Sequence, residues 1–171
     1  MELFRKRRSI RKFTDKKIDT ETLRLLKEAL LRAPSSRDSK PCEFIFVDDS
    51  ALLEKLSHCK EHGSAFLLCA PLGIVVCGDE TKSDVWVENC SIASTFVQLA
   101  ALEFGLGSCW IQIRNRLATG GAASEAVIRE LLDIPDHLRV LSIIAIGFPA
   151  EEKKSVPGEN FDFRKIHYNF C

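Results

Sequence analysis

The sequence predicts one domain of mixed strands and helices, with an α/β or α+β layered fold. Short apolar runs alternate with amphipathic segments in the order strand, helix, strand, helix, strand, helix, strand, after an opening helix. Hydrophobic residues make up 46 % of the 171 residues, which is enough for one sizeable core. Because no repeat, low-complexity block or linker divides the chain, we expect a single domain over residues 1–171.

The opening helix is predicted from apolar residues at helical spacing, namely Leu23, Leu26, Leu30 and Ala33. Thr20 is the expected N-cap, and Pro34 the expected stop. Two short helices are expected later, one capped by Ser50 and spanning 51–59, the other spanning 124–132.

Four short apolar runs are expected to be buried strands, because they are too short for helices and rich in β-branched and aromatic residues. They are 42–47 (CEFIFV), 72–77 (LGIVVC), 109–113 (CWIQI) and 140–146 (VLSIIAI).

The longest predicted helix spans 84–104 and carries apolar residues on two adjacent faces. The first face holds Trp86, Ala93, Val97, Ala100 and Phe104, and the second holds Ile92, Phe96 and Leu99. Two apolar faces predict burial on both sides, in a core or between subunits. Gly105 is placed to be the C′ residue of this helix.

The overall charge and the cysteines limit the class of protein. The 24 basic residues balance the 24 acidic ones and the pI is about 6.9, whereas a nucleic-acid-binding domain typically has a pI above about 9. No apolar run suggests a secretory signal or a membrane span. The seven cysteines are odd in number and contain no CxxC pair, so we expect a reducing, cytoplasmic compartment.

The basic run RRSIRKF, Arg7 to Phe13, is the first candidate for binding chemistry. Arginines beside a serine hydroxyl can hold a phosphate through charge-assisted, bidentate hydrogen bonds. By itself, the run is more typical of a solvated basic arm. A nucleic-acid patch is disfavoured because the chain offers no second basic surface.

Two further segments are candidates for contacts with a ligand. APSSRDSKP, residues 33–41, is either an ordinary helix–strand loop or a constrained supplier of hydroxyls and backbone groups. EFGLGSCWIQ, residues 103–112, is either a capped helix turning into a strand or a glycine turn against a flat ring. No GxGxxG, P-loop, GxSxG or HExxH motif is present. His58, Cys59 and His62 lack a fourth ligand at zinc spacing, so no metal is expected.

Together these segments resemble the nitroreductase family of FMN-dependent oxidoreductases, and the chain is identified as a short member. RRSIRKF is similar to the family's R-R/H-S-x-R/K-x-F motif, and APSSRDSKP to its A-P-S-x-x-N-x-Q-P loop. The long helix with GLGSCWI is similar to a helix followed by G-L-G-x-C-W/P. IGFPAEEK resembles its G-Y-P-x-E ending, and KIHYN its tail.

The resemblance implies an α+β three-layer fold with a mostly antiparallel central sheet flanked by helices. It also implies an intertwined homodimer that pairs through the long helix, with residues from about 150 to 171 forming an arm around the partner. Two FMN molecules would lie at the subunit interface, each touched by both subunits.

The resemblance also assigns cofactor-binding roles to residues. The FMN phosphate and ribityl end would meet Arg7, Arg8 and Ser9, and Arg11 would approach the pyrimidine edge of the ring. The loop residues Pro34, Ser35, Ser36 and Asp38 would reach the partner's flavin. Trp110, Ile111 and Gln112 would line the ring, and Lys153 or Lys154 would add charge at the phosphate. No catalytic acid or base is assigned, because the flavin carries the chemistry.

The chain departs from the family pattern at several positions. Asp38 and Lys40 stand where Asn and Gln are usual, and Cys42 replaces a frequent Trp. Gly63 and Phe66 fall where longer members have an Asn and a Lys that face the flavin. The pyrimidine edge is therefore expected to be held less tightly or from elsewhere. Because the chain is short for the family and lacks the helical excursion that often covers the active site in longer members, a more open pocket is also expected.

The activity that the resemblance implies is ping-pong electron transfer from NADH or NADPH through FMN to a nitroaromatic, quinone or similar small acceptor. The alternative is a non-catalytic FMN-binding or regulatory protein of the same fold. Neither nucleic acid nor a membrane is an expected partner.

Overall fold

The computed structural model describes residues 1–158 and 161–170. Its strands are β1 (Cys42–Val47), β2 (Leu72–Asp79), β3 (Gly107–Gln112) and β4 (Leu138–Gly147). Its helices are α1 (Glu2–Lys6), α2 (Thr20–Leu31), α3 (Ser50–Ser57), α4 (Trp86–Glu103) and α5 (Ser124–Leu131). The 3₁₀ turns within the described ranges are η1 (Ser36–Asp38), η2 (Ala65–Cys69) and η4 (Phe163–Lys165).

The strands form one antiparallel sheet in the order β1-β2-β4-β3. All eight residues of β2 are buried, as are nine of the ten residues of β4, because these central strands are covered on both faces. The register between them shifts once, between Val76 and Cys77. Consecutive side chains of a strand point to opposite faces, so each strand contributes to two separate cores.

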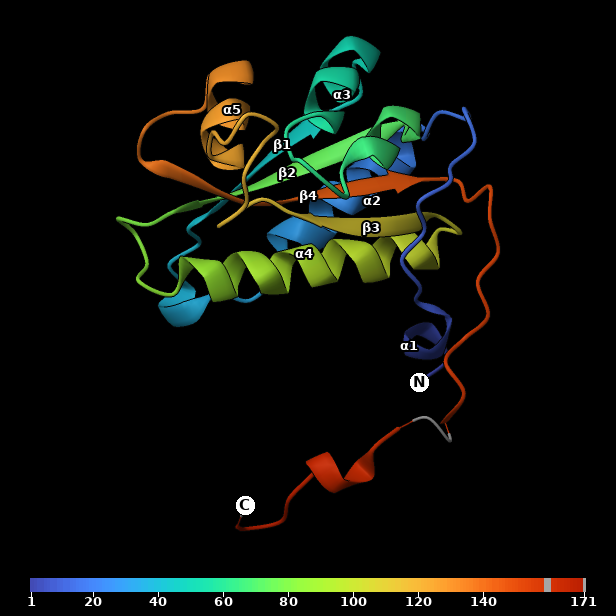
Figure 1. The fold of residues 1–171 in the computed structure, drawn as a ribbon. Coiled ribbons are helices and arrows are strands. Elements are labelled where there is room, and N and C mark those ends of the chain that lie inside the picture. Colours follow the sequence, from blue (N-terminus) through green and yellow to red (C-terminus); the bar gives the residue numbers. More distant parts are fainter. Residues whose placement is uncertain (159–160, 171) are drawn as a thin grey trace.

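The helices cover both faces of the sheet and make a three-layer α+β fold, as predicted (Figure 1). On one face, α2 and α4 pack through Leu26, Leu30, Ala93 and Val97. On the other face, α3, η2 and α5 pack through residues that include Leu53, Leu67 and Ile128.

Both predicted N-caps are wrong by one residue. The Asp19 carboxylate accepts a hydrogen bond from the Thr22 backbone N–H at 2.9 Å, so Asp19, and not Thr20, caps α2. In the same way, Asp49 caps α3 in place of Ser50. In each case an aspartate immediately precedes the predicted residue, and its side-chain oxygen reaches the third N–H beyond it. Gly105 does follow α4 as expected, with φ +71°.

Helix α4 is buried on one side only in the described chain. Ala93 and Val97 are at most 1 % exposed against the sheet. Ile92 and Phe96, from the second predicted apolar face, are 38 % and 39 % exposed. The predicted burial of this face within a core is therefore wrong, and burial between subunits is the remaining interpretation.

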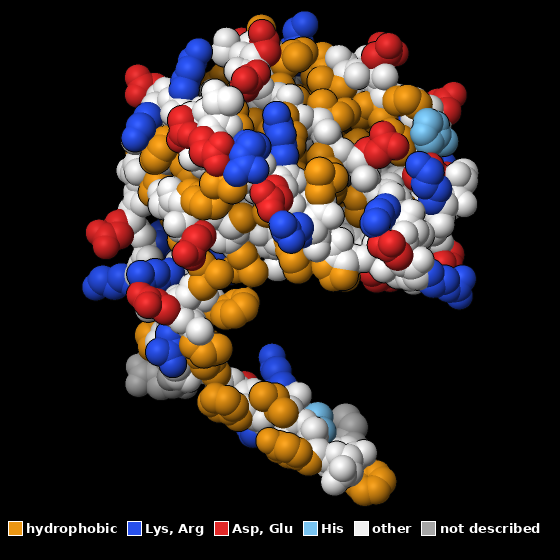
Figure 2. Space-filling view, turned by 180° about the vertical axis from the view of Figure 1, so that it is seen from behind, with side chains coloured by type: hydrophobic (Ala, Val, Ile, Leu, Met, Phe, Trp, Pro, Cys, Tyr) orange, Lys and Arg blue, Asp and Glu red, His pale blue; other side chains and the backbone are white. Residues whose placement is uncertain are grey.

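The C-terminal segment first pairs with the N-terminal segment and then leaves the body. The Thr14 N–H donates to Phe148 O at 2.9 Å, and the Ala150 N–H donates to Lys12 O at 2.8 Å. From residue 155 the chain extends away from the sheet (Figure 1). Figure 2 shows hydrophobic side chains along this extension, and the exposed ones include Phe161, Phe163, Ile166, Tyr168 and Phe170. In the described ranges, no helix is long and apolar enough to cross a membrane.

Candidate functional site

The basic segment RRSIRKF is fixed in place by its apolar residues and by backbone pairing. Ile10 and Phe13 are each 8 % exposed and anchor the segment in the core. The Ile10 N–H donates to Ser108 O at 3.0 Å at the start of the edge strand β3. Gly107 permits this close approach, because a Cβ there would lie 2.8 Å from the Ile10 side chain. The other residues of the segment, which are Arg7, Arg8, Ser9, Arg11 and Lys12, are polar or charged and can contact a ligand.

Cationic groups from both ends of the chain gather beside this segment. The Lys153 ammonium donates to Ser9 O at 2.7 Å, and the Arg8 guanidinium contacts Lys154 O. A cavity of about 170 Å³ lies next to them. Its lining includes Arg7, Arg8, Ser108, Lys153, Glu151 and Glu152. Five predicted site residues, Arg7, Arg8, Ser9, Lys153 and Lys154, are thus brought together across more than 140 residues of sequence.

Glu151 organises this cluster, and sequence reasoning gave it no role. Its carboxylate accepts hydrogen bonds from the backbone N–H groups of Arg11 at 2.6 Å and Lys12 at 3.2 Å. The carboxylate also lies 3.3 Å from the Lys153 ammonium. The Arg11 N–H first, and then Lys153, hold the pKa of Glu151 below its ordinary value. Glu151 therefore ties the basic segment to the chain that follows β4.

The Arg11 side chain reaches toward η2. Its guanidinium lies 5.7 Å from the centre of the Phe66 ring, within cation–π range. The Cys109 thiol is buried nearby, and burial raises its pKa although Arg11 opposes that shift. The Phe66 ring thus holds the Arg11 guanidinium on the η2 side of the basic segment.

Strand β3 offers an open backbone edge next to these cations. Ser108 O faces away from β4, since it accepts from Ile10. Backbone groups of alternate residues point to the same edge of a strand, so Trp110 and Gln112 present theirs on that side too. The Trp110 indole N–H donates to Gln112 Oε1 at 3.0 Å, which fixes both side chains. Ile111 is only 1 % exposed, so its side chain belongs to the core.

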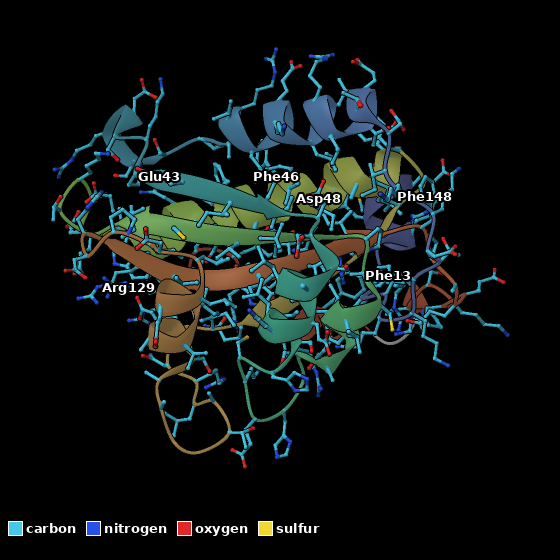
Figure 3. The ribbon with its side chains drawn as sticks, turned by 90° about the horizontal axis from the view of Figure 1, so that it is seen from above. Phe13, Glu43, Phe46, Asp48, Arg129 and Phe148 are labelled. Carbon is cyan, nitrogen blue, oxygen red and sulfur yellow. The ribbon has the colours of Figure 1, made fainter. Side chains whose placement is uncertain are left out.

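The loop 34–38 lies apart from the basic segment. Figure 1 places η1 near the start of α4 and α1 near its end, and α4 with 18 residues is about 27 Å long. Figure 3 agrees: Glu43, just after this loop, lies at the opposite end of the sheet from Phe13. Pro34, Ser35, Ser36 and Asp38 are therefore not brought together with Arg7, Arg8 and Ser9 within one chain.

Asn89 of α4 holds this loop and was missed in the sequence. Its side-chain oxygen accepts from the Ser36 N–H at 2.9 Å, and its amide donates to Ser83 at 3.1 Å. Asn89 is 2 % exposed. The sequence does carry one signal, because a polar residue stands among the apolar positions of this helix.

The model of the nitroreductase family matches residues 4–61 and 55–148, which together span most of the chain. Among solved structures, an FMN-dependent nitroreductase from Clostridium difficile is 45 % identical, with a TM-score of 0.97. That match covers 99 % of this chain and 98 % of the other.

Two curated proteins with names of flavin or nitroreductase enzymes are also similar to this chain. A protein from Archaeoglobus fulgidus named "Putative NADH dehydrogenase/NAD(P)H nitroreductase" is 36 % identical over 94 % of this chain and 92 % of its own length. An FMN reductase [NAD(P)H] from Bacillus subtilis is 27 % identical over 95 % of this chain and 72 % of its own. The family match, together with the basic segment and the open edge of β3, shows that the chain belongs to the nitroreductase family.

Proposed function

We propose that this protein is an FMN-dependent oxidoreductase that passes electrons from NADH or NADPH to a small acceptor such as a nitroaromatic or a quinone. Family membership supports the reaction type, and relatives named as FMN reductase and FMN-dependent nitroreductase support the cofactor. The observation that carries the proposal is the cluster of cations beside the open edge of β3.

The residues present fit FMN. Arg7, Arg8 and Lys153 line the cavity and supply charged donors, which suit a phosphate. Ser9, whose carbonyl accepts from Lys153, adds a hydroxyl to this segment. Lys154 adds a further positive charge at this end. The backbone edge at Trp110 and Gln112 suits the polar rim of a flat ring. Bound FMN would supply the redox chemistry, namely two-electron transfer between a nicotinamide and the acceptor.

The chain itself positions groups and supplies charge. Glu151 holds the backbone at Arg11 and Lys12, so the arginine side chain leaves a fixed point on the main chain. Arg11 places positive charge beside the β3 edge, where it favours negative charge on a bound ring. Pre-placed charge lowers the reorganisation needed during electron transfer.

The binding site is shared between two subunits in this proposal. One chain holds the basic segment and the loop 34–38 at opposite ends of α4, so one flavin cannot meet both within a subunit. The exposed face of α4 with Ile92 and Phe96 suits a homodimer contact. The C-terminal arm, from about residue 155, would then cover its apolar side chains on the partner. Residues 159–160 and 171 of that arm lie outside the described residues.

We propose that the chain forms one domain over residues 1–171. We also propose that the protein resides in a reducing, cytoplasmic compartment. The six described cysteines are all free thiols, which suits such a compartment.

The proposal is tested with purified protein. It should show a bound-flavin absorption spectrum and should oxidise NADH or NADPH when a nitroaromatic or a quinone is added. A colourless protein that gains no thermal stability from added FMN would refute the proposal. Bound flavin that neither nicotinamide reduces under anaerobic conditions would instead indicate the non-catalytic FMN-binding protein.

A further inference from the structure

Two cysteines from different elements face one another at the start of β1. The Sγ atoms of Cys42 in β1 and Cys90 in α4 are 3.3 Å apart. Because an S–S bond is about 2.05 Å long, the two sulfurs need to approach by only about 1.2 Å to form one. Forty-seven residues separate the two positions in the sequence, so the fold, and not local spacing, brings them together.

A glycine makes room for this pair. Gly78 is the partner of Cys42 across the β1–β2 ladder. A Cβ at Gly78 would lie 2.9 Å from Cys90 Sγ and 2.6 Å from the Trp86 ring. The space that a side chain would fill opposite Cys42 is thus occupied by the Cys90 thiol and Trp86.

The two thiols are chemically unequal. Cys90 is fully buried, whereas Cys42 is half-buried. A hydrogen bond from Cys90 lowers the pKa of Cys42, while that bond and burial raise the pKa of Cys90. Since the thiolate is the nucleophile, Cys42 is suited to react first and Cys90 to follow.

Small molecules have a route to Cys42. Cys42 lines a cavity of about 60 Å³ together with Pro34, Ser35, Lys40 and Asn89. A cavity for one water needs roughly 10–15 Å³, so this one admits a molecule of the size of hydrogen peroxide.

We propose that Cys42 and Cys90 form a peroxide-sensitive dithiol that closes to a reversible disulfide between β1 and α4. In the first step the Cys42 thiolate attacks one oxygen of hydrogen peroxide, the O–O bond breaks, and hydroxide leaves, which gives a sulfenic acid on Cys42. In the second step the Cys90 sulfur attacks Cys42 Sγ, and the hydroxyl leaves as water with the Cys90 proton. Two thiols and one peroxide thus become one disulfide and two waters.

The test maps the disulfide in the purified holo-protein. The protein is treated with a small excess of hydrogen peroxide, its remaining thiols are alkylated, and it is digested with a glutamyl endopeptidase. Cleavage after glutamates gives peptide 29–43, which contains only Cys42, and peptide 89–103, which contains only Cys90. We expect the two peptides linked, two hydrogen masses below their sum, and separated again by dithiothreitol.

Two variants sharpen the test. Cys69→Ser removes an exposed cysteine outside the pair and should leave the linked peptide unchanged. In Cys90→Ser, the Cys42 sulfenic acid has no partner thiol, so dimedone should label peptide 29–43. The proposal would be overturned if Cys69 is oxidised while peptides 29–43 and 89–103 stay separate and alkylated. A link from Cys42 to any other cysteine would overturn it as well.

Discussion

The Glu151 carboxylate accepts the Arg11 backbone N–H at 2.6 Å, across 140 residues of sequence. This contact joins the segment after the last strand to the basic segment near the N-terminus, and the Lys153 ammonium lies on the same carboxylate. The basic segment and the segment directly after β4 therefore form one structural unit on which the proposed phosphate site depends.

Replacing Glu151 by Gln should weaken FMN binding. The amide keeps an acceptor for Arg11 but loses the charge that attracts Lys153 and strengthens the hydrogen bonds, so Kd should rise about tenfold. Flavin fluorescence titration of the apoprotein measures this change. Glu130→Gln, at an exposed position of α5, should bind FMN like the unchanged protein. An unaltered Kd for Glu151→Gln would show that the contact does not support the site.

Replacing Lys153 by Met should remove charge from the phosphate site while keeping the length of the side chain. We expect FMN binding to weaken by about 10- to 100-fold and to depend less on salt concentration. Titrations at several salt concentrations measure both effects. Lys55→Met is the matched control, because Lys55 is an exposed lysine of α3. Equal losses in the two variants would mean that Lys153 acts only through the overall charge.

Mixing two variants tests whether the site is shared. Lys153→Met impairs the basic half, and Asn89→Leu removes the acceptor that holds Ser36 in the loop half. In a mixed dimer one site carries both defects and the other carries none. Random exchange makes about half of the dimers mixed, so about a quarter of all flavin sites should be intact. Tight flavin binding after joint refolding is the measurement. If mixing restores no tight site, both halves belong to the same subunit.

Asp79, at the end of β2, should make stability depend on acid pH. A hydrogen bond from the Thr81 hydroxyl first, helped by the Lys82 ammonium, lowers the pKa of Asp79 from 3.8 to about 2. Because the folded-state pKa is the lower one, the stabilisation is present above pH 3.8 and is lost as the pH falls toward about 2.

Thermal unfolding of Asp79→Asn across pH measures this effect. The variant should have a lower Tm than the unchanged protein at neutral pH, and the difference should shrink below pH 3.8. Asp48→Asn, at an exposed position after β1, should show no such pattern. A difference that stays constant down to pH 2 would exclude the carboxylate charge as its source.

The strands could be predicted closely because each is a short apolar run. The first strand was predicted at 42–47 and is found at Cys42–Val47, and the others differ by at most two residues at either end. Helix α1 was not predicted, because Glu2–Lys6 is too short to show a helical period. Both N-cap errors arose where two capping residues are adjacent, so that composition alone does not choose between them.

The site could be predicted only where its residues form sequence motifs. The basic segment was found because four cations stand within seven residues. Glu151 and Asn89 act on backbone N–H groups 140 and 53 residues away, and neither contact leaves a local pattern. The loop also places Arg37, Asp38 and Lys40 at positive φ, which favours glycine and is not evident from these residue types.

The separation of the two half-sites along α4 has a consequence for handling the protein. On the proposed assembly, cofactor uptake and subunit association are linked equilibria, each of which promotes the other. Dilution would then release flavin even when every binding residue is intact, and added FMN would hold subunits together. The absorbance of bound flavin at a given protein concentration would thus measure the fraction of the protein that is dimeric.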